Sequence, residues 1–539
     1  MRRRAVQSLA VAGLFALLTA AMTWPQALHL GSRATPHQDV YFNMWRLRWF
    51  AHAMATPSAG LFDGNIFHPE PRTLAYSDAM LVEGIVAAPL LWAGLKPVLV
   101  HNLLLLGAIA ASGLAMCALA RYLTGSLGAG VVAGMVFAFA PYRFEHIMHM
   151  ELQWTMWMPL AFLALHRTFD TGKWRYGLAT GGCIALQMLS SIYYGVFLAS
   201  LIAPGALLLM IGDRKVALPR ALLPLAAGAV LAAAVSAAYA VPYLRVQSRV
   251  GERTSEEIAS YSARPANYLA ATPSNWLYGR RTASRGGVER HLFPGVIPVL
   301  LAIVGLLLRS PSARAIVYLL LLAAAFEASL GLYGHIYPWL YEHVAPYRGL
   351  RAPARLGVFV LMFLAVLAAY GCQALVQRRS AIVRAALVAG LTLGLIAEYH
   401  VTVGLSAFAN TVPPVYRVLA SQPRGIVAEF PMPRADALPG DDAEYSYLST
   451  FHWFPLVNGY SGTYPPSYLA RLEQVRGFPD DRSIIQLRRD NVTYVIVHGS
   501  AYPGGAFGAV RSRIATGSAL VELGPFNDVG GHAVLYRLR

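Results

Sequence analysis

Residues 98–120 read VLVHNLLLLGAIAASGLAMCALA, an uninterrupted stretch of predominantly apolar residues. A helix of about 20 apolar residues is long enough to cross the ~30 Å hydrocarbon core of a bilayer. Ten further apolar segments lie at residues 5–23, 127–141, 152–166, 176–190, 195–212, 218–240, 293–309, 314–333, 355–376 and 382–402. We therefore predict a mainly α, polytopic membrane protein with about 11 transmembrane helices.

The composition of the 539-residue chain agrees with this fold class. Hydrophobic residues make up 56% and charged residues 13%, and the mean hydropathy is +0.47. Soluble proteins have about 45–50% apolar and about 25% charged residues, so a soluble enzyme, a disordered chain and a collagen-like chain are excluded. Cys117, Cys183 and Cys372 lie in apolar segments without zinc-site spacing, which makes a disulfide framework improbable as well. The sequence contains no Walker-type phosphate loop, which disfavours an ATP-driven pump.

The orientation in the membrane follows from the positive charge. Lys and Arg number 44 against 27 Asp and Glu, and short cytoplasmic loops usually hold the excess. The orientation depends on whether the apolar stretch 79–95 crosses the membrane. This stretch is ambiguous, because it contains a Glu, a Pro and two Gly residues and is short for a span. If it lies in the interface, the basic residues of the N-terminus and the short inner loops are Arg2, Arg3, Arg4, Arg121, Arg167, Lys173, Arg175, Arg214, Lys215, Arg220, Arg309, Arg314, Arg378, Arg379 and Arg384.

Only Arg143, Arg348 and Arg351 then fall in the short outer loops. We therefore predict a cytoplasmic N-terminus and an extracytoplasmic C-terminus. A cleaved signal peptide ending near Ala20 and Ala21 is the alternative to a retained first helix. We favour the retained helix, because the chain continues as a membrane protein.

This topology places every long polar segment on the outer face, namely a first outer loop at 24–97, the loops 241–292 and 334–354, and a tail. We expect residues 1–402 to form the transmembrane domain and residues 403–539 to form a small C-terminal α/β soluble domain. In the tail the sequence predicts strands at 425–430 and 493–497, a helix at 483–489, and a hairpin around Gly530 and Gly531.

The first outer loop contains an early acidic residue, Asp39, in the stretch PHQDVY of residues 36–41. Helices are expected at 41–55, where Trp45 and Trp49 suit the membrane interface, and at 79–95. Both would lie on the membrane. One interpretation is that Asp39 caps the helix starting near Tyr41, and the other is that it has a chemical function.

The second outer loop gathers polar side chains at the ends of two apolar spans. Residues 140–151 read APYRFEHIMHME and contain Arg143, Glu145, His146, His149 and Glu151. In a helical turn His149 would share a face with His146 and with Glu145. Such a set could bind a divalent metal, act as acid and base, or bind a phosphate; the alternative is a set of hydrated interfacial residues. We favour a function, because polar groups at a membrane boundary are costly.

The third group of outer-face candidates is arginine-rich. Residues 347–355 read YRGLRAPAR and contain Arg348, Arg351 and Arg355, where a span begins. Guanidinium groups suit bidentate binding of a lipid phosphate or pyrophosphate, and lipid headgroup anchoring is an equal alternative. The loop 241–292 also ends in a polar run that includes Glu289 and His291, to which the sequence assigns no role.

With these features the chain resembles the GT-C superfamily of membrane glycosyltransferases. The resemblance covers the layout of residues 1–402 and rests on Asp39, on YRFEHIMH at 142–149, and on RGLRAPAR at 348–355. It is greatest to poorly characterised bacterial members. The tail has no Trp-Trp-Asp motif, which disfavours an oligosaccharyltransferase. Gln38-Asp39-Val40 stands in place of an Asp-Glu pair, which disfavours protein O-mannosylation.

The resemblance implies an inverting glycosyltransferase of the bacterial inner membrane. Such an enzyme would move a hexosyl or pentosyl group from a polyprenyl-phosphate-linked donor to an extracytoplasmic glycan, lipid or protein, with no role for nucleic acid. Asp39 would be the catalytic base and Glu145 a second catalytic residue. His146, His149 and Glu151 would orient the acceptor or a metal.

The resemblance also implies that Arg143, Arg348, Arg351 and Arg355 hold the donor phosphate. It leaves open a divalent metal, Mg²⁺ or Mn²⁺, with Asp39, Glu145, His146 and His149 as candidate ligands.

Two other functions stay open. A transporter or flippase for lipid-linked sugars should have inverted repeats or helices broken near the midplane, and the sequence contains no evident repeat. A non-catalytic, lipid-binding protein of envelope assembly would have the same overall composition.

Overall fold

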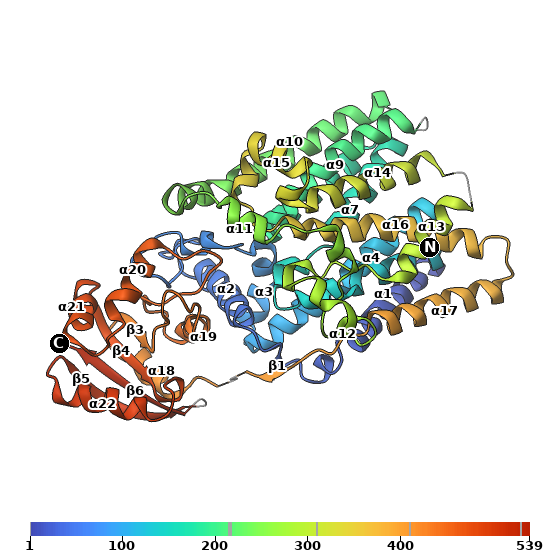
Figure 1. The fold of residues 1–539 in the computed structure, drawn as a ribbon. Helices are drawn as coiled ribbons and strands as arrows, with labels where there is room; N and C mark the ends of the chain where they lie inside the picture. The colour runs from blue at the N-terminus through green and yellow to red at the C-terminus, as the bar shows by residue number, and fades with distance from the viewer. Residues whose placement is uncertain (1, 214–217, 309–310, 409–410, 529–530) are drawn as a thin grey trace. The chain divides into compact units, whose positions relative to one another are not determined.

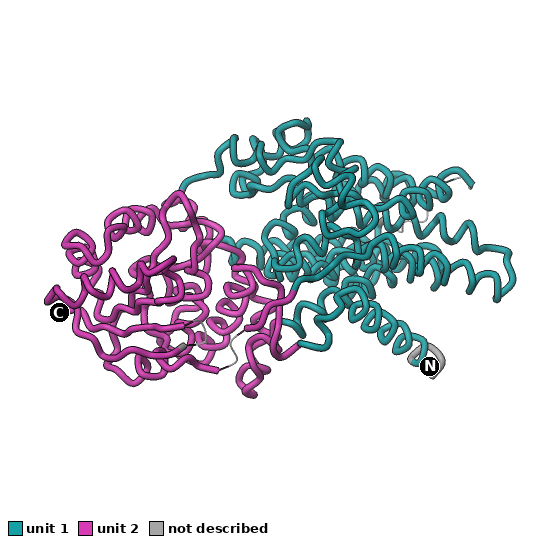
Figure 2. The backbone as a smooth tube through the Cα atoms, turned by 60° about the horizontal axis from the view of Figure 1, so that its bottom comes forward, with its two compact units in different colours: residues 1–29, 102–241, 251–404 teal, residues 30–101, 242–250, 405–539 magenta. Residues whose placement is uncertain are grey.

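The computed structural model describes residues 2–213, 218–308, 311–408, 411–528 and 531–539, and it is mainly helical (Figure 1). Arg214, Lys215, Arg309 and Gly530, which the sequence analysis used, lie outside the described residues. The chain divides into two compact units (Figure 2). Unit 1 contains residues 1–29, 102–241 and 251–404, and unit 2 contains residues 30–101, 242–250 and 405–539.

Unit 1 consists of helices, and each of the eleven predicted apolar segments is helical. They are α1 (Arg2–Met22), α4 (Pro97–Thr124), α5 (Leu127–Phe139), α7 (Trp157–Thr171), α8 (Trp174–Ser190), α9 (Ile192–Gly212), α10 (Leu218–Val250), α13 (Val296–Leu307), α14 (Ala313–Ser329), α16 (Gly357–Val376) and α17 (Ala381–Tyr399). The first residues of α4 and the last residues of α10 belong to unit 2. Short helices between them are α6 (Pro141–Glu145), α11 (Ser255–Ser260), α12 (Gly279–Thr282) and α15 (Ile336–His343).

Six helices within the described residues are long and apolar enough to cross a membrane. They span Pro97–Thr124, Leu127–Glu145, Ile192–Gly212, Pro219–Val250, Pro353–Val376 and Ala381–Tyr399. The chain is thus a multi-pass membrane protein. The other predicted spans form helices that are shorter or less apolar, so the total of about 11 crossings stays a prediction.

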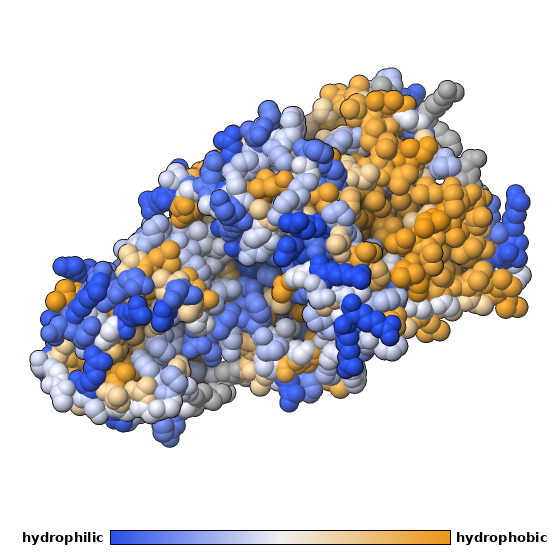
Figure 3. Space-filling view, viewed as in Figure 1, coloured by the Kyte–Doolittle hydropathy of each residue, from blue (hydrophilic) through white to orange (hydrophobic). Residues whose placement is uncertain are grey.

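The surface of unit 1 shows why a membrane is required. Figure 3 shows hydrophobic residues gathered over the helices of this unit. Leu223, Val230, Leu307 and Ile382 are each more than 60% exposed. Apolar surface of this extent is not stable in water and marks a lipid or partner interface.

Helix packing inside unit 1 relies on glycine. A Cβ on Gly371 of α16 would overlap the backbone oxygen of Leu301 in α13, and a Cβ on Gly305 would lie 2.7 Å from the backbone N of Gly371. The two backbones therefore touch directly. Small residues at such crossings are typical of membrane helices, which associate through close packing.

Unit 2 combines the C-terminal tail with the first outer loop. Its four-stranded sheet has the order β3-β4-β6-β5, with β3 (Ile426–Phe430) parallel to β4 (Val492–His498), and β6 (Gly531–Leu538) antiparallel to β4 and to β5 (Leu520–Asp528). Its helices are α2 (Gln38–Ala55), α3 (Leu81–Trp92), α18 (Pro414–Ala420), α19 (Asp442–Leu448), α20 (Pro466–Val475), α21 (Asp481–Arg489) and α22 (Ala506–Thr516). The predicted strands 425–430 and 493–497 and the helix 483–489 correspond to β3, β4 and α21.

The first outer loop groups with the tail, whereas the sequence analysis placed it in the transmembrane domain. Strand β1 (Arg33–Ala34) pairs antiparallel with β2 (Ser406–Ala407). Backbone hydrogen bonds also join residues 65–68 to residues 456–458. Contacts between segments almost 400 residues apart have no local signal in the sequence, which is why composition alone gave a single boundary near residue 402.

The two helices predicted in the first outer loop are α2 and α3, and they pack on each other through Phe50, Ala51 and Ala88. Helix α2 begins at Gln38, three residues before the expected start, and its N-cap is His37. Asp39 is therefore in the first turn of the helix rather than at the cap.

The glycine contact between α13 and α16 gives a test of the packing. We expect Gly371→Ala to lower the free energy of unfolding by about 1–3 kcal/mol, because the methyl group would meet backbone atoms that have no rotamer to change. The measurement is thermal unfolding of the protein purified in detergent.

The matched control is Gly390→Ala in α17, where a Cβ meets nothing within 4 Å. This substitution should be neutral or slightly stabilising, because Ala is the better helix former. Equal melting temperatures for the two variants would contradict the close packing of α13 on α16.

Candidate active site

Asp39 lies in the first turn of α2, and its side chain is 15% exposed. The hydroxyl of Tyr460 donates a hydrogen bond to Oδ1 of Asp39 at 2.7 Å. Nδ1 of His37 lies 3.2 Å from Oδ2 of Asp39 and accepts a hydrogen bond from the backbone N–H of Asp39 at 3.1 Å. A carboxylate here is also favoured by the positive end of the helix dipole.

A second polar cluster, in unit 1, is built around Glu145, the last residue of α6. Nδ1 of His291 lies 2.9 Å from Oε1 of Glu145, and Nε2 of His291 lies 3.0 Å from the carbonyl oxygen of Ala283. Both ring nitrogens thus face acceptors, as in an imidazolium. Burial alone would lower the pKa of His291, but the hydrogen bond and the charge of Glu145 raise it. Oε2 of Glu145 is buried and has no hydrogen-bond partner among the residues that the structure describes.

Next to this pair lies a bidentate ion pair between Arg355 and Glu289. Nε of Arg355 bonds Oε2 of Glu289 at 3.1 Å, and Nη2 bonds Oε1 at 2.6 Å. The guanidinium also lies 4.7 Å from the ring centroid of Tyr193. Burial by itself would raise the pKa of Glu289, but Arg355 and then His146 hold it well below its usual range. The carboxylate is therefore ionised at any pH at which the protein would be used.

The histidines of the second outer loop belong to the same cluster. Nε2 of His146 lies 3.7 Å from Oε2 of Glu289, and Nδ1 of His146 lies 3.3 Å from Nδ1 of His149. Burial lowers the pKa of His146 to about 3, although the charge of Glu289 opposes the shift. His146 is therefore neutral and can serve as a hydrogen-bonding group. Glu151 is buried at the 3₁₀ turn Met150–Leu152.

The four arginines proposed for phosphate binding have three different environments. Arg143 is buried and donates to Thr155 Oγ1 at 2.5 Å and to Oε1 of Gln153 at 3.0 Å, so it holds its own loop together. Arg355 is paired with Glu289 as described. Arg348 and Arg351 are partly exposed.

Arg348 and Arg351 share a cationic cluster in unit 1 with Arg253. Arg351 Nη1 lies 3.4 Å and Arg253 Nη1 lies 3.3 Å from the same oxygen of Glu257, while Arg348 Nη1 lies 3.8 Å from Glu252. These ion pairs bring three guanidinium groups and two carboxylates of the described residues together. The backbone N–H of Arg253 bonds the carbonyl oxygen of Arg348 at 3.2 Å, which fixes the two loops to each other. The excess positive charge suits an anionic ligand.

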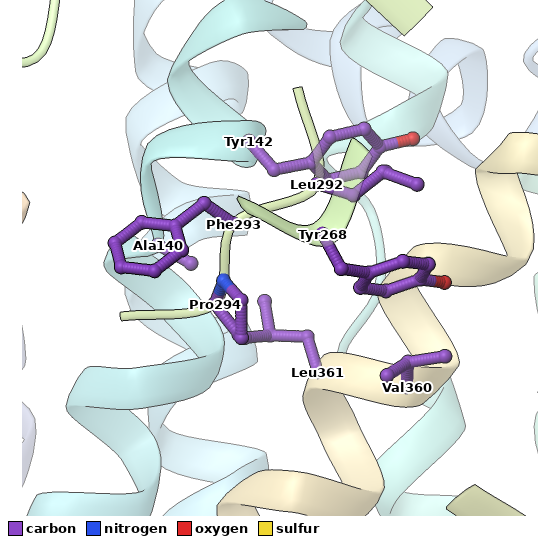
Figure 4. Close-up of a pocket in the computed structure, with 9 residues that line it drawn as sticks. Ala140, Tyr142, Tyr268, Leu292, Phe293, Pro294, Val360 and Leu361 are labelled. Carbon is purple, nitrogen blue, oxygen red and sulfur yellow. The ribbon is translucent and has the colours of Figure 1, made fainter. Parts of the chain in front are cut away.

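A small apolar pocket adjoins the Glu145 cluster. It is lined by Ala140, Tyr142, Tyr268, Leu292, Phe293, Pro294, Gly357, Val360 and Leu361. In Figure 4, Tyr142 and Leu292 lie at the top of the pocket and Val360 and Leu361 at its bottom. None of these lining residues has a charged side chain. The groups in this region that could take part in a reaction are therefore those of the neighbouring Glu145 cluster.

The candidate metal ligands do not fit a metal ion. Among the residues that the structure describes, no group of three or more His, Cys, Asp or Glu side chains could hold one. In the second outer loop the acid pairs with His291 and the two histidines face each other. We therefore assign no step to a metal.

The sequence-predicted residues thus fall into two sets, because Asp39 belongs to unit 2 and the other candidates belong to unit 1. Within unit 1 the structure brings Glu145, His146 and Arg355 into one cluster through Glu289 and His291. The sequence analysis noted Glu289 and His291 as polar residues without a role, and it did not single out Tyr460. For Glu289 and His291 the available signal was their E-x-H spacing in the loop 241–292.

No family model matches the chain, and no curated protein matches it by sequence. Several solved structures resemble it, among them the following two. One is the arabinofuranosyltransferase AftD from Mycobacteria, with a TM-score of 0.62 and 15% sequence identity over 98% of this chain and 41% of that one. The other is the archaeal oligosaccharyltransferase AglB from Archaeoglobus fulgidus, with a TM-score of 0.48 and 13% identity over 92% of this chain and 69% of that one.

The chain thus spans less than half the length of the mycobacterial protein. At this identity the likeness concerns the fold. It confirms the fold that the resemblance to the GT-C superfamily implied, since the chain shares the fold of the mycobacterial arabinofuranosyltransferase.

Proposed function

We propose that the protein is an inverting glycosyltransferase that transfers a sugar from a polyprenyl-phosphate-linked donor to a hydroxyl acceptor on the outer face of a bacterial inner membrane. The observation that supports this best is the carboxylate of Asp39, mostly shielded from water and hydrogen-bonded by a phenol, in the first outer loop of a chain with the GT-C fold. The mycobacterial protein of similar fold is an arabinofuranosyltransferase, which makes a pentofuranose the first donor sugar to test.

The proposed chemistry needs one base. The Asp39 carboxylate takes the proton of the acceptor hydroxyl as the oxygen attacks the anomeric carbon. The bond between that carbon and the phosphate oxygen breaks, and its electron pair leaves with polyprenyl phosphate. Because the nucleophile enters opposite the leaving group, the anomeric configuration inverts.

The leaving phosphate needs cationic stabilisation, since negative charge develops on it as the bond breaks. We assign this role to Arg348 and Arg351, whose cluster has more guanidinium groups than carboxylates. Arg355 is paired bidentately with Glu289, so a phosphate would have to compete with that carboxylate. We therefore give Arg355 the role of ordering Glu289 and the loop around it.

Glu145 is proposed to bind a sugar hydroxyl. Its Oε1 is engaged by His291, while its buried Oε2 lacks a hydrogen-bond donor within the described part of the chain. A buried acceptor left without a donor costs about 1–3 kcal/mol, so a hydroxyl that donates to it is stabilised. The neutral His146 and its neighbour His149 extend the same polar surface.

The assignment of the base is tested by Asp39→Asn. The amide keeps the size of the side chain but cannot take a proton, so transfer should fall by about 10²–10⁴-fold. The measurement is release of polyprenyl phosphate and transfer of radiolabelled sugar from synthetic polyprenyl-phosphoryl arabinofuranose in membranes, followed by the hexose analogues.

Asp436→Asn is the matched control, because Asp436 is an exposed residue of unit 2 that pairs with Arg434 two residues away. It should transfer at the wild-type rate. Undiminished transfer by Asp39→Asn at normal expression would rule out Asp39 as the base.

The phosphate-binding role is tested by Arg351→Gln. The loss of one charge-assisted contact should raise the KM for the lipid-linked donor about tenfold or more and leave the unfolding temperature unchanged. Arg351→Lys should give an intermediate KM, because it keeps the charge but loses the fork geometry. Steady-state kinetics in detergent with varied donor measure both.

Arg511→Gln is the control, since Arg511 forms an exposed pair with Glu522 in unit 2. If Arg351→Gln keeps the KM of the wild type but weakens association with anionic vesicles, Arg351 is a lipid headgroup anchor instead. A double variant, Asp39→Asn with Arg351→Gln, shows by its non-additivity whether the two residues serve one reaction.

A further inference from the structure

Tyr460 is the tail residue whose side chain touches the proposed base. Its hydroxyl lies 2.7 Å from Oδ1 of Asp39, a short distance typical of a hydrogen bond to a charged acceptor. The two residues are 421 positions apart in the chain, and both belong to unit 2.

The ring of Tyr460 is held against α2. It meets the ring of Phe42 edge-on, with centroids 5.2 Å apart, and Phe42 stacks on Trp45 at 5.5 Å. The guanidinium of Arg46 lies 4.5 Å from the centroid of Phe42. Phe42 follows Asp39 by one helical turn, so the helix that carries the carboxylate also carries the surface on which the tyrosine rests.

The backbone next to Tyr460 is fixed as well. Asn458 donates to the carbonyl oxygen of Glu429 at 2.9 Å and accepts from the N–H of Glu429 at 2.8 Å, which ties the segment to strand β3. The carbonyl oxygen of Asn458 accepts from the N–H of Phe67 at 2.9 Å. Gly459 has no room for a side chain, since a Cβ would lie 2.6 Å from the ring of Phe67. The fold thus fixes the backbone segment that carries Tyr460, as well as the contact of its ring with α2.

We propose that Tyr460 is a positioning residue for Asp39: it fixes the rotamer of the carboxylate and stabilises its ionised form. This inference rests on the proposed role of Asp39 as the base. A hydrogen bond that holds one carboxylate oxygen sets the direction of the other, and a base misplaced by about 1 Å can lose about 10²-fold in rate. The C-terminal domain would then take part in catalysis without contacting the reacting atoms.

The chemistry of the phenol supports this role. Burial, followed by the charge of Asp39, raises the pKa of Tyr460 far above its ordinary value, so the hydroxyl stays protonated and can only donate to the carboxylate. Ring packing on Phe42 would be equally possible for a phenylalanine, which lacks the hydroxyl. The other titratable or charged groups that act on the pair are His37, Arg46 and Tyr464.

The test is Tyr460→Phe, which keeps the ring and removes the hydroxyl. A pH titration of the infrared carboxyl band, taken as the difference between each protein and its Asp39→Asn version, reports the ionisation of Asp39 alone. We expect protonation to occur about one pH unit higher in Tyr460→Phe, because the carboxylate loses a donor to its charged form. The acidic limb of the pH profile of sugar transfer should move by the same amount, and kcat should fall about ten- to a hundredfold with little change in KM.

The control is Tyr494→Phe, since the hydroxyl of Tyr494 makes one hydrogen bond elsewhere in unit 2, to the carbonyl oxygen of Pro423 at 2.9 Å. It should leave the titration and the profile unchanged. Replacing Tyr460 by 3-fluorotyrosine provides a second variant that keeps the packing. Its phenol is the stronger donor, so the titration should move to lower pH.

An unchanged titration in both Tyr460 variants would overturn the inference, whatever the enzyme assay gives. Loss of transfer in Asp39→Asn with a wild-type titration in Tyr460→Phe would leave the proposed base in place and refute only the positioning role. A shifted Asp39 titration in Tyr460→Phe together with undiminished transfer by Asp39→Asn would refute the role of Asp39 as the base instead. A variant that combines Tyr460→Phe with Asp39→Asn should be no less active than Asp39→Asn alone, because Tyr460 acts through Asp39.

Discussion

The backbone hydrogen bonds between residues 65–68 and residues 456–458 are the contacts on which the position of the candidate base depends. The N–H of Leu456 bonds Asn65, and the N–H groups of Phe67 and His68 bond Asn458 and Leu456. Leu456 and Phe67 are buried, where an unpaired backbone group would be costly, so these bonds hold the first outer loop and the tail in one compact unit. That unit contains both the first turn of α2 and the segment of Tyr460. Without this pairing, Asp39 would lose the hydrogen bond from Tyr460.

The candidate charged groups of the two units lie in different surroundings. In unit 2 the Asp39 carboxylate is bonded by a neutral phenol, which supports the negative charge and does not neutralise it. In unit 1 the buried carboxylates Glu289 and Glu145 face a guanidinium and an imidazole, because unpaired charges next to apolar spans are expensive. The partly exposed cluster of Arg348 and Arg351 keeps a cationic excess. A base and an anion-binding surface are the two electrostatic requirements of a transfer with a phosphate leaving group.

Prediction from sequence succeeded where the signal is local. Apolar runs of about 20 residues specify helices in a bilayer, and a strand such as 493–497 is recognised from its own composition. Asp39, Glu145 and the arginines of the RGLRAPAR stretch could be selected because polar groups at a membrane boundary stand out. The sequence does not predict the pairing of Arg355 with Glu289 or of Glu145 with His291, since these partners are 66 and 146 residues apart. Arg355 therefore looked like a free phosphate ligand in the sequence, whereas the fold gives it a carboxylate.

Sequence patterns alone specify a helical membrane protein with an α/β tail, and they select the loops in which we propose the chemistry. Each of these properties is encoded in neighbouring residues, through the length of an apolar run, the alternation of a strand or the composition of a loop. The tertiary contacts are what bring the first outer loop to the tail, the Tyr460 hydroxyl to Asp39, and Arg348 and Arg351 into one cluster with Arg253. These depend on which distant segments pack together, and the free energy of that packing belongs to pairs of segments and not to either one alone.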